Sequence, residues 1–543
     1  MITRRGFLAS AAAAAAPLAQ STRGPQRLSG MMLDAARLPE SIAHYRRVID
    51  FCAEWGYNAI LFRLTDDQGC ALRFASHPEL VTHANALTPR DASDLAGYGE
   101  KRGVLLIPEV ESFGHTKFIT GVAKYAVLED GDPSKRGMGG ICPVHPDAVQ
   151  IIHDLYRETA RIFPSPYFHG GCDEVNWGFS ERSKQATAAK SRTGVWADYV
   201  NSLGDLARSL GKDFIIWGDV VAHKEPEILP RLDKRTIVMD WQYYVSDADP
   251  LRRTARALLD DGRRVMGAPA MISCKWGPRC ADVQLRNIDA FADAYRSLPD
   301  AGNLGVVITN WIPPRYLARS MWDTYAYGAV ALKSGSTAAR MNAFVDFPSM
   351  FYGAKSSPAW EAMFLRYYAD TPARQSCSNG WKGAYLPVPW TNETDLRASI
   401  AANPVAPPDF AVLRREIAAL ESSVRRNHHD FSAFALSAEY IEHLYTRQKP
   451  TPESIRAIAE ADRAILQKLE AEWDSSRPAN SPGKSQPLTY LAAQDQLLFR
   501  MREAAKFSSE LEQHPSLVGR VFNMRRLSNL PGRPPEAIAA CGL

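Results

Sequence analysis

Eight short apolar runs in the first 311 residues constrain the fold of this chain more than any other feature. Each run is rich in Val, Ile, Leu and aromatic residues, which is typical of a strand buried on both faces of a parallel sheet. The runs occupy residues 28–34, 58–64, 104–110, 167–174, 213–219, 236–242, 265–271 and 304–311. Helical patterns lie between several of them, which predicts right-handed strand–helix–strand units.

Three of these helical patterns carry recognisable ends. An apolar face from Ile42 to Cys52 is followed by Gly56, which can end a helix, and Gly211 can end a second helix that starts near Trp196. Asp147 is expected to cap a third. Eight strands alternating with helices predict an α/β fold, a (β/α)8 TIM barrel over residues 25–345. A doubly wound open sheet is the alternative, although no Gly-x-Gly-x-x-Gly turn follows the first run.

The strand signals stop after about residue 345. Three apolar stripes at helical spacing follow instead, and a Ser/Pro/Gly-rich segment at 474–487 separates two of them. The stripes consist of Leu413, Ile417, Leu420 and Val424; of Ile455, Ile458, Ile465, Leu466, Leu469 and Trp473; and of Leu488, Leu491, Leu498 and Met501. We therefore expect an α-helical domain over 350–543, packed on the barrel or on a second copy of the chain in a homo-oligomer.

The first 22 residues have the pattern of an export signal. Arg4 and Arg5 precede a weakly apolar, alanine-rich stretch that ends in small residues near Ala19. Adjacent arginines favour the twin-arginine route. This predicts a periplasmic or secreted protein, the alternative being a disordered alanine-rich start.

Composition and charge exclude several classes of function. The 543 residues are 45% hydrophobic, and 64 Lys and Arg against 60 Asp and Glu leave a net charge of +4, so nothing favours nucleic acid or an anionic membrane. Beyond the signal, no stretch reaches the roughly 18 apolar residues of a membrane span. The eight cysteines contain no Cys-x-x-Cys pair, so a zinc site is not expected, although Cys274 and Cys280 could form a disulfide.

Acidic and aromatic residues gather where the predicted strands end, which in a barrel of this kind is the active-site face. They are Asp34 and Arg37; Asp66 and Asp67; Glu109, Glu111 and His115; His169, Asp173 and Glu174; Trp217 and Asp219; Asp240, Trp241, Tyr243 and Tyr244; and Asn310 and Trp311. Carboxylates can transfer protons, and aromatic rings can pack on the apolar face of a pyranose. The combination favours a glycosidase acting on a neutral sugar.

The adjacent acids Asp173 and Glu174 are the most specific of these features. Two neighbouring carboxylates at the end of an apolar strand repel each other and are partly desolvated, so we expect at least one of their pKa values to be raised. A carboxylic acid that stays protonated near neutral pH can protonate a leaving-group oxygen. A structural ion-paired dyad and a magnesium or calcium site are the alternatives.

Four motifs resemble glycoside hydrolase family 20, the β-N-acetylhexosaminidases. The segment His169-Gly170-Gly171-Cys172-Asp173-Glu174 is similar to the family's His-x-Gly-Gly-Asp-Glu signature, with Cys172 in place of the second Gly. Matching segments precede it in order: Leu33-Asp34-Ala35-Ala36-Arg37, Leu64-Thr65-Asp66-Asp67-Gln68-Gly69, and Pro108-Glu109-Val110-Glu111-Ser112-Phe113-Gly114-His115, with Glu111 where Asp is usual. The resemblance covers roughly residues 28–320.

The resemblance implies substrate-assisted, retaining hydrolysis of terminal β-linked GlcNAc or GalNAc without a cofactor. Glu174 would be the acid and then the base, while Asp173 would orient the substrate's acetamido group, whose oxygen attacks the anomeric carbon. The residues assigned to substrate binding are Arg37, Asp67, Glu111, His115, His169, Trp217, Trp241, Tyr243, Asn310 and Trp311. Seven of these ten residues have a plainer alternative: an ion pair for Arg37, a helix cap for Asp67, and core packing for the two histidines and the three tryptophans.

The sequence departs from the family pattern in three places. The usual small N-terminal domain is missing, Cys274-Lys275-Trp276 stands where a Tyr-x-Asp run is normal, and no Glu follows Trp311 closely. Tyr243 or Tyr244 could supply the missing hydroxyl. Two alternatives stay open. One is a retaining barrel glycosidase with an enzyme nucleophile such as Glu111, and the other is a catalytically silent carbohydrate-binding protein, which the departures after strands 7 and 8 favour.

Overall fold

The computed structural model describes residues 27–134, 139–272, 279–280, 282–369, 409–446, 451–478 and 497–518. The predicted signal segment, the Cys274-Lys275-Trp276 run and two residues of the third apolar stripe, Leu488 and Leu491, lie outside the described residues.

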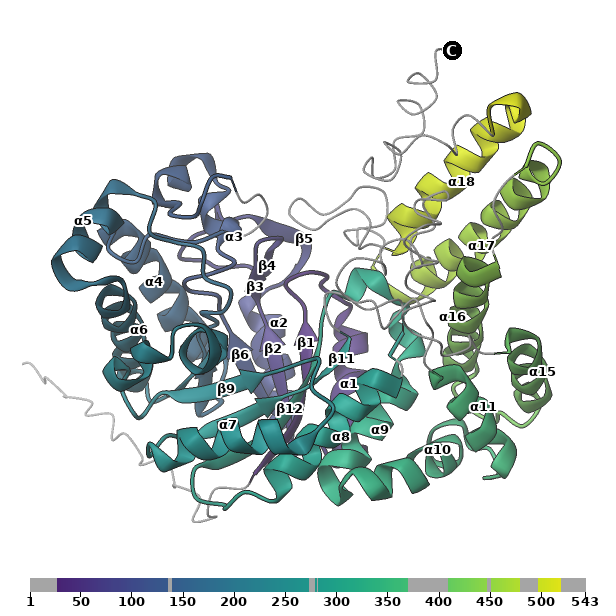
Figure 1. Cartoon of the computed structure of the whole chain (residues 1–543), viewed down its shortest axis with the longest axis horizontal. Coiled ribbons are helices and arrows are strands. Elements are labelled where there is room, and N and C mark those ends of the chain that lie inside the picture. Colours follow the sequence, from purple (N-terminus) through teal and green to yellow (C-terminus); the bar gives the residue numbers. More distant parts are fainter. Residues whose placement is uncertain are drawn as a thin grey trace, which may run out of the picture.

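Eight parallel strands close into a barrel, as predicted (Figure 1). They are, in order around the barrel, β1 (Leu28–Asp34), β2 (Ala59–Arg63), β6 (Leu105–Glu109), β7 (Tyr167–His169), β8 (Asp213–Trp217), β9 (Ile237–Trp241), β10 (Val265–Ala268) and β12 (Asn303–Asn310). The ring closes where β1 pairs with β12 and Leu28 lies opposite Gly305. A side chain at Gly305, whose φ is 97°, would place its Cβ 2.0 Å from the Leu28 carbonyl oxygen, so this closure requires glycine. The closed ring rules out the open-sheet alternative.

Helices surround the barrel, and short strands extend its rim. The helices are α1 (Ile42–Trp55), α2 (Pro89–Glu100), α3 (Lys117–Thr120), α4 (Pro146–Ile162), α5 (Glu181–Lys190), α6 (Arg192–Ser209), α7 (Ala248–Asp260), α8 (Asp282–Arg296) and α9 (Trp322–Ser334). The additional strands are β3 (Thr65–Asp66), β4 (Gly69–Leu72) and β5 (Thr82–Leu87), which form a separate small sheet, and β11 (Ala270–Ile272), which pairs with β12.

The strands are apolar along their whole length because both of their faces are buried. In β1, Met31 and Leu33 belong to the apolar layer between strands and helices, whereas Leu28 and Met32 belong to the cluster inside the barrel. Successive side chains of a strand point to opposite faces, so each strand supplies both cores at once. This explains why the sequence shows continuous apolar runs rather than alternation.

Three local predictions need correction. The run 167–174 forms a strand only as far as His169, because Gly171, Cys172 and Glu174 have positive φ values and leave the sheet. The run 265–271 is split by Pro269, which has no N–H to donate, into β10 and β11. His145, rather than Asp147, caps α4, and its ring accepts a hydrogen bond from the Asp147 N–H. The predicted helix end at Gly56 is confirmed.

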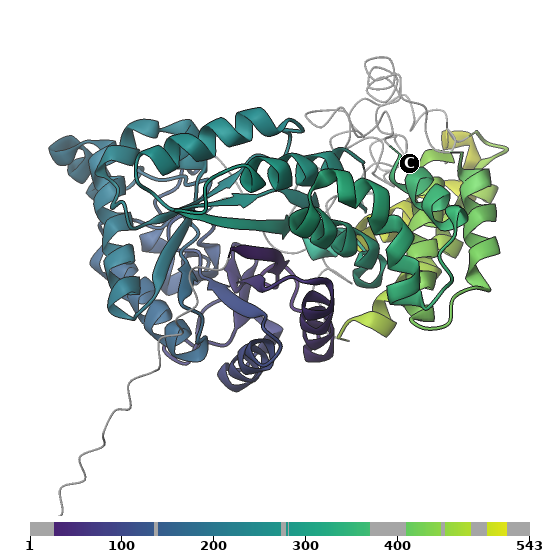
Figure 2. The same cartoon turned by 90° about the horizontal axis from the view of Figure 1, so that it is seen from below.

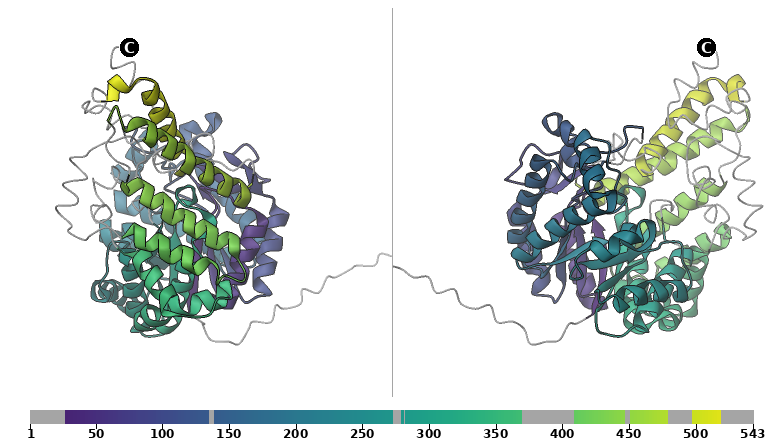
Figure 3. Two further views of the ribbon diagram at one scale, coloured as in Figure 1. Left: turned by 90° about the vertical axis from the view of Figure 1, so that its right-hand side faces the viewer. Right: turned by 60° about the vertical axis from the view of Figure 1, so that its left-hand side comes forward.

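Helices make up the described C-terminal part, and they pack against the barrel (Figures 2 and 3). They are α10 (Ser336–Tyr352), α11 (Pro358–Tyr368), α15 (Phe410–Glu421), α16 (His428–Thr446), α17 (Ile455–Ser476) and α18 (Leu497–Gln513). The first two apolar stripes lie on α15 and α17, except for Val424, which follows α15, and their side chains are buried or partly buried. The predicted boundary between the barrel and the helical domain, at residues 345–350, falls inside α10. This boundary stays a prediction. Within the described ranges, no helix has both the length and the apolar character needed to cross a bilayer.

Candidate active site

Four side chains form one row across four neighbouring strands at the carboxyl end of the barrel. Asp34, Arg63, Glu109 and His169 are the last residues of β1, β2, β6 and β7, and each lies opposite the next in the strand register. Parallel strands that end together bring these groups to one edge of the sheet. The row therefore alternates acid, cation, acid and imidazole.

Arg63 is the centre of this row, although it is not among the site residues predicted from the sequence. Its side chain has no exposed surface. One guanidinium nitrogen, Nη1, donates to Glu109 Oε1 at 2.6 Å and to Glu111 Oε1 at 2.7 Å, while Nη2 donates to Asp66 Oδ2 at 2.7 Å. Acids gathered at three neighbouring strand ends need a cation between them when they are buried. The arginine near the end of the second apolar run is the sequence feature that could have identified it.

Burial raises the pKa values of two acids in this network. Desolvation outweighs the attraction of Arg63, so the pKa of Glu109 is raised to about 7 and that of Glu111 well above its ordinary value. Trp217 Nε1 donates to Glu109 Oε1 at 2.9 Å. Glu111 is fully buried in this structure, and its assignment to substrate binding stays a prediction.

The turn after β7 is held in an unusual backbone conformation. Gly171, Cys172 and Glu174 have φ values of 67°, 72° and 46°, in the left-handed region that favours glycine. Glu111 Oε2 accepts a hydrogen bond from the Cys172 N–H at 3.3 Å, and a Cβ at Gly171 would lie 1.9 Å from the same oxygen. The carboxylate of Glu111 therefore fits against the bare backbone of this turn and supports a strained segment.

The two acids at the end of this turn differ in exposure. The side chain of Glu174 is 41% exposed, whereas that of Asp173 is 8% exposed and its Oδ1 has no hydrogen-bond partner. The backbone N–H of Glu174 donates to Asp219 Oδ2 at 3.1 Å, and this carboxylate also accepts from Lys224 Nζ at 2.6 Å. Glu174 thus faces solvent on a backbone that Asp219 fixes.

His115 links Glu174 to Asp67. Its Nδ1 lies 2.9 Å from Asp67 Oδ2 and its Nε2 lies 3.4 Å from Glu174 Oε2. Burial opposes a charge on the ring, but Asp173, Asp67 and Glu174 together raise the pKa of His115 well above its ordinary value. The contact with His115 lowers the pKa of Glu174 to about 2. The expectation of a raised pKa is therefore wrong for Glu174, because the imidazole stabilises its ionised form.

Aromatic side chains form a connected wall beside the acids. The Trp217 and Trp311 ring centroids are 5.7 Å apart, Trp311 Nε1 donates to the Tyr243 hydroxyl at 2.9 Å, and Tyr243 stacks on Trp241 at 4.9 Å. Trp217 is fully buried and Trp241 is half-buried. The structure thus brings these four residues, all assigned to substrate binding from the sequence, together, although the most deeply buried of them, Trp217, does not reach solvent.

Arg37 lies at the end of this wall. Its guanidinium carbon is 5.2 Å from the centroid of the Trp311 ring, and it pairs with Asp34 and Asp66 at 2.9 Å each. The site therefore joins the loops that follow β1, β2 and β12.

Two predicted site residues have other partners. Asn310 Nδ2 donates to the hydroxyls of Tyr316 and Tyr325, both at 2.9 Å, behind the wall. His169 is fully buried, and its Nδ1 accepts from the Gly171 N–H at 3.0 Å while burial lowers the pKa of the ring. Through this hydrogen bond, His169 supports the turn that leads to Asp173.

The described residues contain no group of three or more His, Cys, Asp or Glu side chains with the arrangement of a metal site. The acids of the barrel rim are instead neutralised by Arg63 and Arg37. The arrangement as a whole offers one exposed acid, one recessed acid with an unused oxygen, and an aromatic wall.

The catalytic-domain model of glycosyl hydrolase family 20 matches residues 27–271. A β-hexosaminidase of Vibrio furnissii is 25% identical over 246 residues, covering 39% of each chain, and a β-hexosaminidase subunit beta of Felis catus is 24% identical over 271 residues, covering 47% of this chain and 48% of the relative. The chain thus spans less than half the length of these relatives.

Solved structures give similar matches. An exo-β-N-acetylglucosaminidase of this family from Vibrio harveyi, solved with N-acetylglucosamine, is 20% identical with a TM-score of 0.44, covering 58% of this chain and 54% of the other. The family match covers the barrel from β1 to β11, including all four motifs around Arg37, Asp67, His115 and Glu174. The barrel of this chain therefore matches the catalytic domain of glycosyl hydrolase family 20, as a divergent relative.

Proposed function

We propose that the chain is an exo-acting β-N-acetylhexosaminidase that removes terminal β-linked GlcNAc or GalNAc with retention of configuration. The observation that carries this proposal is the paired geometry of Asp173 and Glu174, one recessed with an unpartnered oxygen and one open to solvent. A recessed acceptor suits the N–H of an acetamido group, and an exposed acid suits the departing glycosidic oxygen.

The reaction follows from these positions. Glu174 protonates the glycosidic oxygen as its bond to the anomeric carbon breaks, and the acetamido oxygen attacks that carbon to form an oxazolinium ion. Asp173 accepts the acetamido N–H and stabilises the positive charge that develops there. Water then adds to the anomeric carbon as the bond from that carbon to the acetamido oxygen breaks, which restores the acetamido group, and the water gives a proton to Glu174.

His115 supplies the proton that Glu174 needs. The raised pKa of His115 and the lowered pKa of Glu174 place their shared proton on the imidazole at neutral pH. A sugar that covers the exposed carboxylate removes water from it, which raises the pKa of Glu174 and favours transfer of the proton to its oxygen. Asp67 stabilises His115 on the opposite side of the ring.

The geometry disfavours Glu111 as an enzyme nucleophile. Glu111 has no exposed surface, and its two oxygens already accept from Arg63 and from the Cys172 N–H. A nucleophile has to reach the anomeric carbon with a free lone pair. A catalytically silent sugar-binding protein remains the second candidate, and the small exposed fraction of Asp173 is the observation that favours it.

One assay set separates these functions. Aryl β-glycosides of GlcNAc, GalNAc, glucose and galactose are compared at equal concentrations, with and without a thiazoline mimic of the oxazolinium ion. The proposal predicts turnover of the acetamido sugars only, inhibited by the thiazoline. Turnover of glucosides through a trapped glycosyl-enzyme would support an enzyme nucleophile, and binding without turnover would support the silent protein.

We also propose export by the twin-arginine route, which rests on Arg4 and Arg5 ahead of the alanine-rich stretch. Replacing both arginines with Lys should retain the full-length precursor inside the cell. Fractionation of a bacterial host and the size of the exported chain test this proposal, and unchanged export of the variant would contradict it.

A further inference from the structure

The loops after β1 and β12 meet at the substrate wall. Arg37 on the first loop stacks on Trp311 on the second, and the Ile312 N–H donates to Asp34 Oδ2 at 3.0 Å. Ile312 has a φ of 58°, a conformation that is costly for a β-branched residue. Contacts elsewhere in the structure have to hold this turn in place.

Arg477, directly after α17, supplies such contacts from the far side of both loops. Its Nε donates to Glu40 Oε1 at 2.9 Å on the β1 loop, and its Nη1 and Nη2 donate to the carbonyls of Tyr316 at 3.2 Å and Pro313 at 3.1 Å on the β12 loop. The side chain is fully buried, and its guanidinium carbon lies 3.9 Å from the Trp473 ring centroid. A planar guanidinium holds its donors on three nitrogens in a rigid fork that reaches three separated acceptors, whereas the three donors of an ammonium group lie on one nitrogen.

Apolar packing reinforces the same junction. Leu38 from the β1 loop and Leu317 from the β12 loop belong to one buried cluster with Leu469, Trp473 and Leu498 from α17 and α18. The two loops are therefore seated on the C-terminal helices as well as on the barrel.

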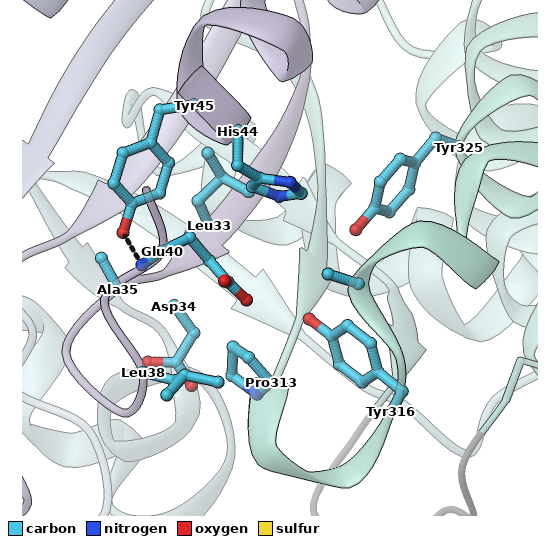
Figure 4. Close-up of a pocket in the computed structure, with 11 residues that line it drawn as sticks. Leu33, Asp34, Ala35, Leu38, Glu40, His44, Tyr45, Pro313, Tyr316 and Tyr325 are labelled. Carbon is cyan, nitrogen blue, oxygen red and sulfur yellow. Dashed lines mark hydrogen bonds between the residues drawn. The ribbon is translucent and has the colours of Figure 1, made fainter. Parts of the chain in front are cut away.

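A small hollow lies beside this junction, between the loops that follow β1 and β12. Glu40, Tyr316 and Tyr325 point into it, and Asp34 forms part of its lining (Figure 4). Glu40 Oε2 is buried there without a hydrogen-bond partner, so Arg477 is the cation that offsets the charge of this carboxylate. Without it, Glu40 would be a buried charge that lacks its counter-ion.

We propose that Arg477 is a positioning residue through which the C-terminal helices hold the Arg37–Trp311 wall in its substrate-binding shape. This inference rests on the proposed function. The wall and the acids have separate supports, because Glu111 and Asp219 hold the Asp173–Glu174 turn and neither contacts Arg477. Loss of Arg477 therefore weakens substrate binding more than the chemical step.

The test compares steady-state kinetics of the full chain and its Arg477→Met variant on an aryl N-acetyl-β-glucosaminide. A wall displaced by a fraction of an ångström is expected to raise KM about 10-fold while kcat changes less than about 3-fold. A purely structural role would lower the active fraction, which reduces apparent kcat and leaves KM unchanged. Arg463→Met is the matched control, because Arg463 also lies on α17 but binds Ser509 and Glu512 on α18 and is 45% exposed.

Two further variants keep the test decisive. Arg477→Lys retains the charge but not the three-way contact, so its KM should lie between those of the wild type and Arg477→Met. If Arg477→Met does not fold, the double variant Glu40→Gln/Arg477→Met removes both buried charges together and should show the same rise in KM.

The outcomes separate this inference from the function on which it rests. If the wild-type chain is inactive, both the proposed function and this inference are wrong. An active wild-type chain whose folded Arg477 variants keep KM within about 2-fold, or lose only kcat, would overturn the inference alone.

Discussion

Replacement of Arg63 by Met should be one of the most destabilising single changes in the barrel. Arg63 is fully buried and donates to Glu109, Glu111 and Asp66 at 2.6 to 2.7 Å, with Asp34 at 3.7 Å from its Nε. Removing one partner of a buried ion pair typically costs about 3–5 kcal/mol, because the remaining charge stays buried without compensation. Since several acids lose the same cation, we expect a loss at the upper end of that range.

The loss should also grow with pH. In the folded state the pKa of Glu109 is about 7, against about 4.3 when unfolded, so this group contributes less to stability as pH rises through that interval. Arg63 lowers the pKa of both Glu109 and Glu111, so in its absence they must stay protonated to higher pH. Between its pKa in the wild type and its higher pKa in the variant, each such carboxyl adds about 1.4 kcal/mol to the difference in unfolding free energy per pH unit.

Urea denaturation at about pH 5.5 and about pH 8 measures both effects, and Arg264→Met is the matched control. Arg264 makes a two-pronged contact with Asp213, but both side chains are partly exposed, so its loss should cost less than about 1 kcal/mol. A loss for Arg63→Met below about 1 kcal/mol, or one that is equal at both pH values, would refute the reasoning.

Two other predictions concern the acids themselves. Asp173→Asn should reduce turnover more on acetamido substrates than on substrates with an activated leaving group and no acetamido group, whereas equal losses would argue against participation of the substrate's own amide. His115→Asn removes the contact that lowers the pKa of Glu174 to about 2, so that pKa should rise to or above about 4.3. The proton is then lost from Glu174 instead of His115, so the high-pH limb of kcat/KM should move to lower pH, and an unchanged pH profile would contradict the pairing.

The barrel could be predicted from the sequence because each strand is buried on both faces. Continuous apolar runs such as Leu28–Asp34 mark such strands directly, and that run coincides with β1. The ends of strands are harder to predict, because backbone strain depends on tertiary contacts. The run 167–174 gives no sign in the sequence that it leaves the sheet after His169, yet its backbone takes positive φ values there and contacts Glu111 from the segment after β6.

The acids of the site were predictable by type, but their electrostatics were not. The sequence predicts that Asp173 and Glu174 repel each other, whereas in the structure His115 lies against Glu174 and lowers the pKa of that carboxyl. Arg63 was missed because an arginine at the end of an apolar strand is normally expected to reach solvent. Only the strand register shows that it lies between Asp34 and Glu109.

The most direct test of the central claim is the turnover number of Glu174→Gln on an aryl N-acetyl-β-glucosaminide. Glutamine keeps the size of the side chain but cannot give up a proton, and proton transfer by a positioned carboxyl is worth about 10²–10⁴-fold. Glu181→Gln, an exposed acid in nearby α5, is the control and should retain full activity. The account predicts that Glu174→Gln loses at least about 100-fold in kcat, and near-wild-type turnover by that variant would contradict it.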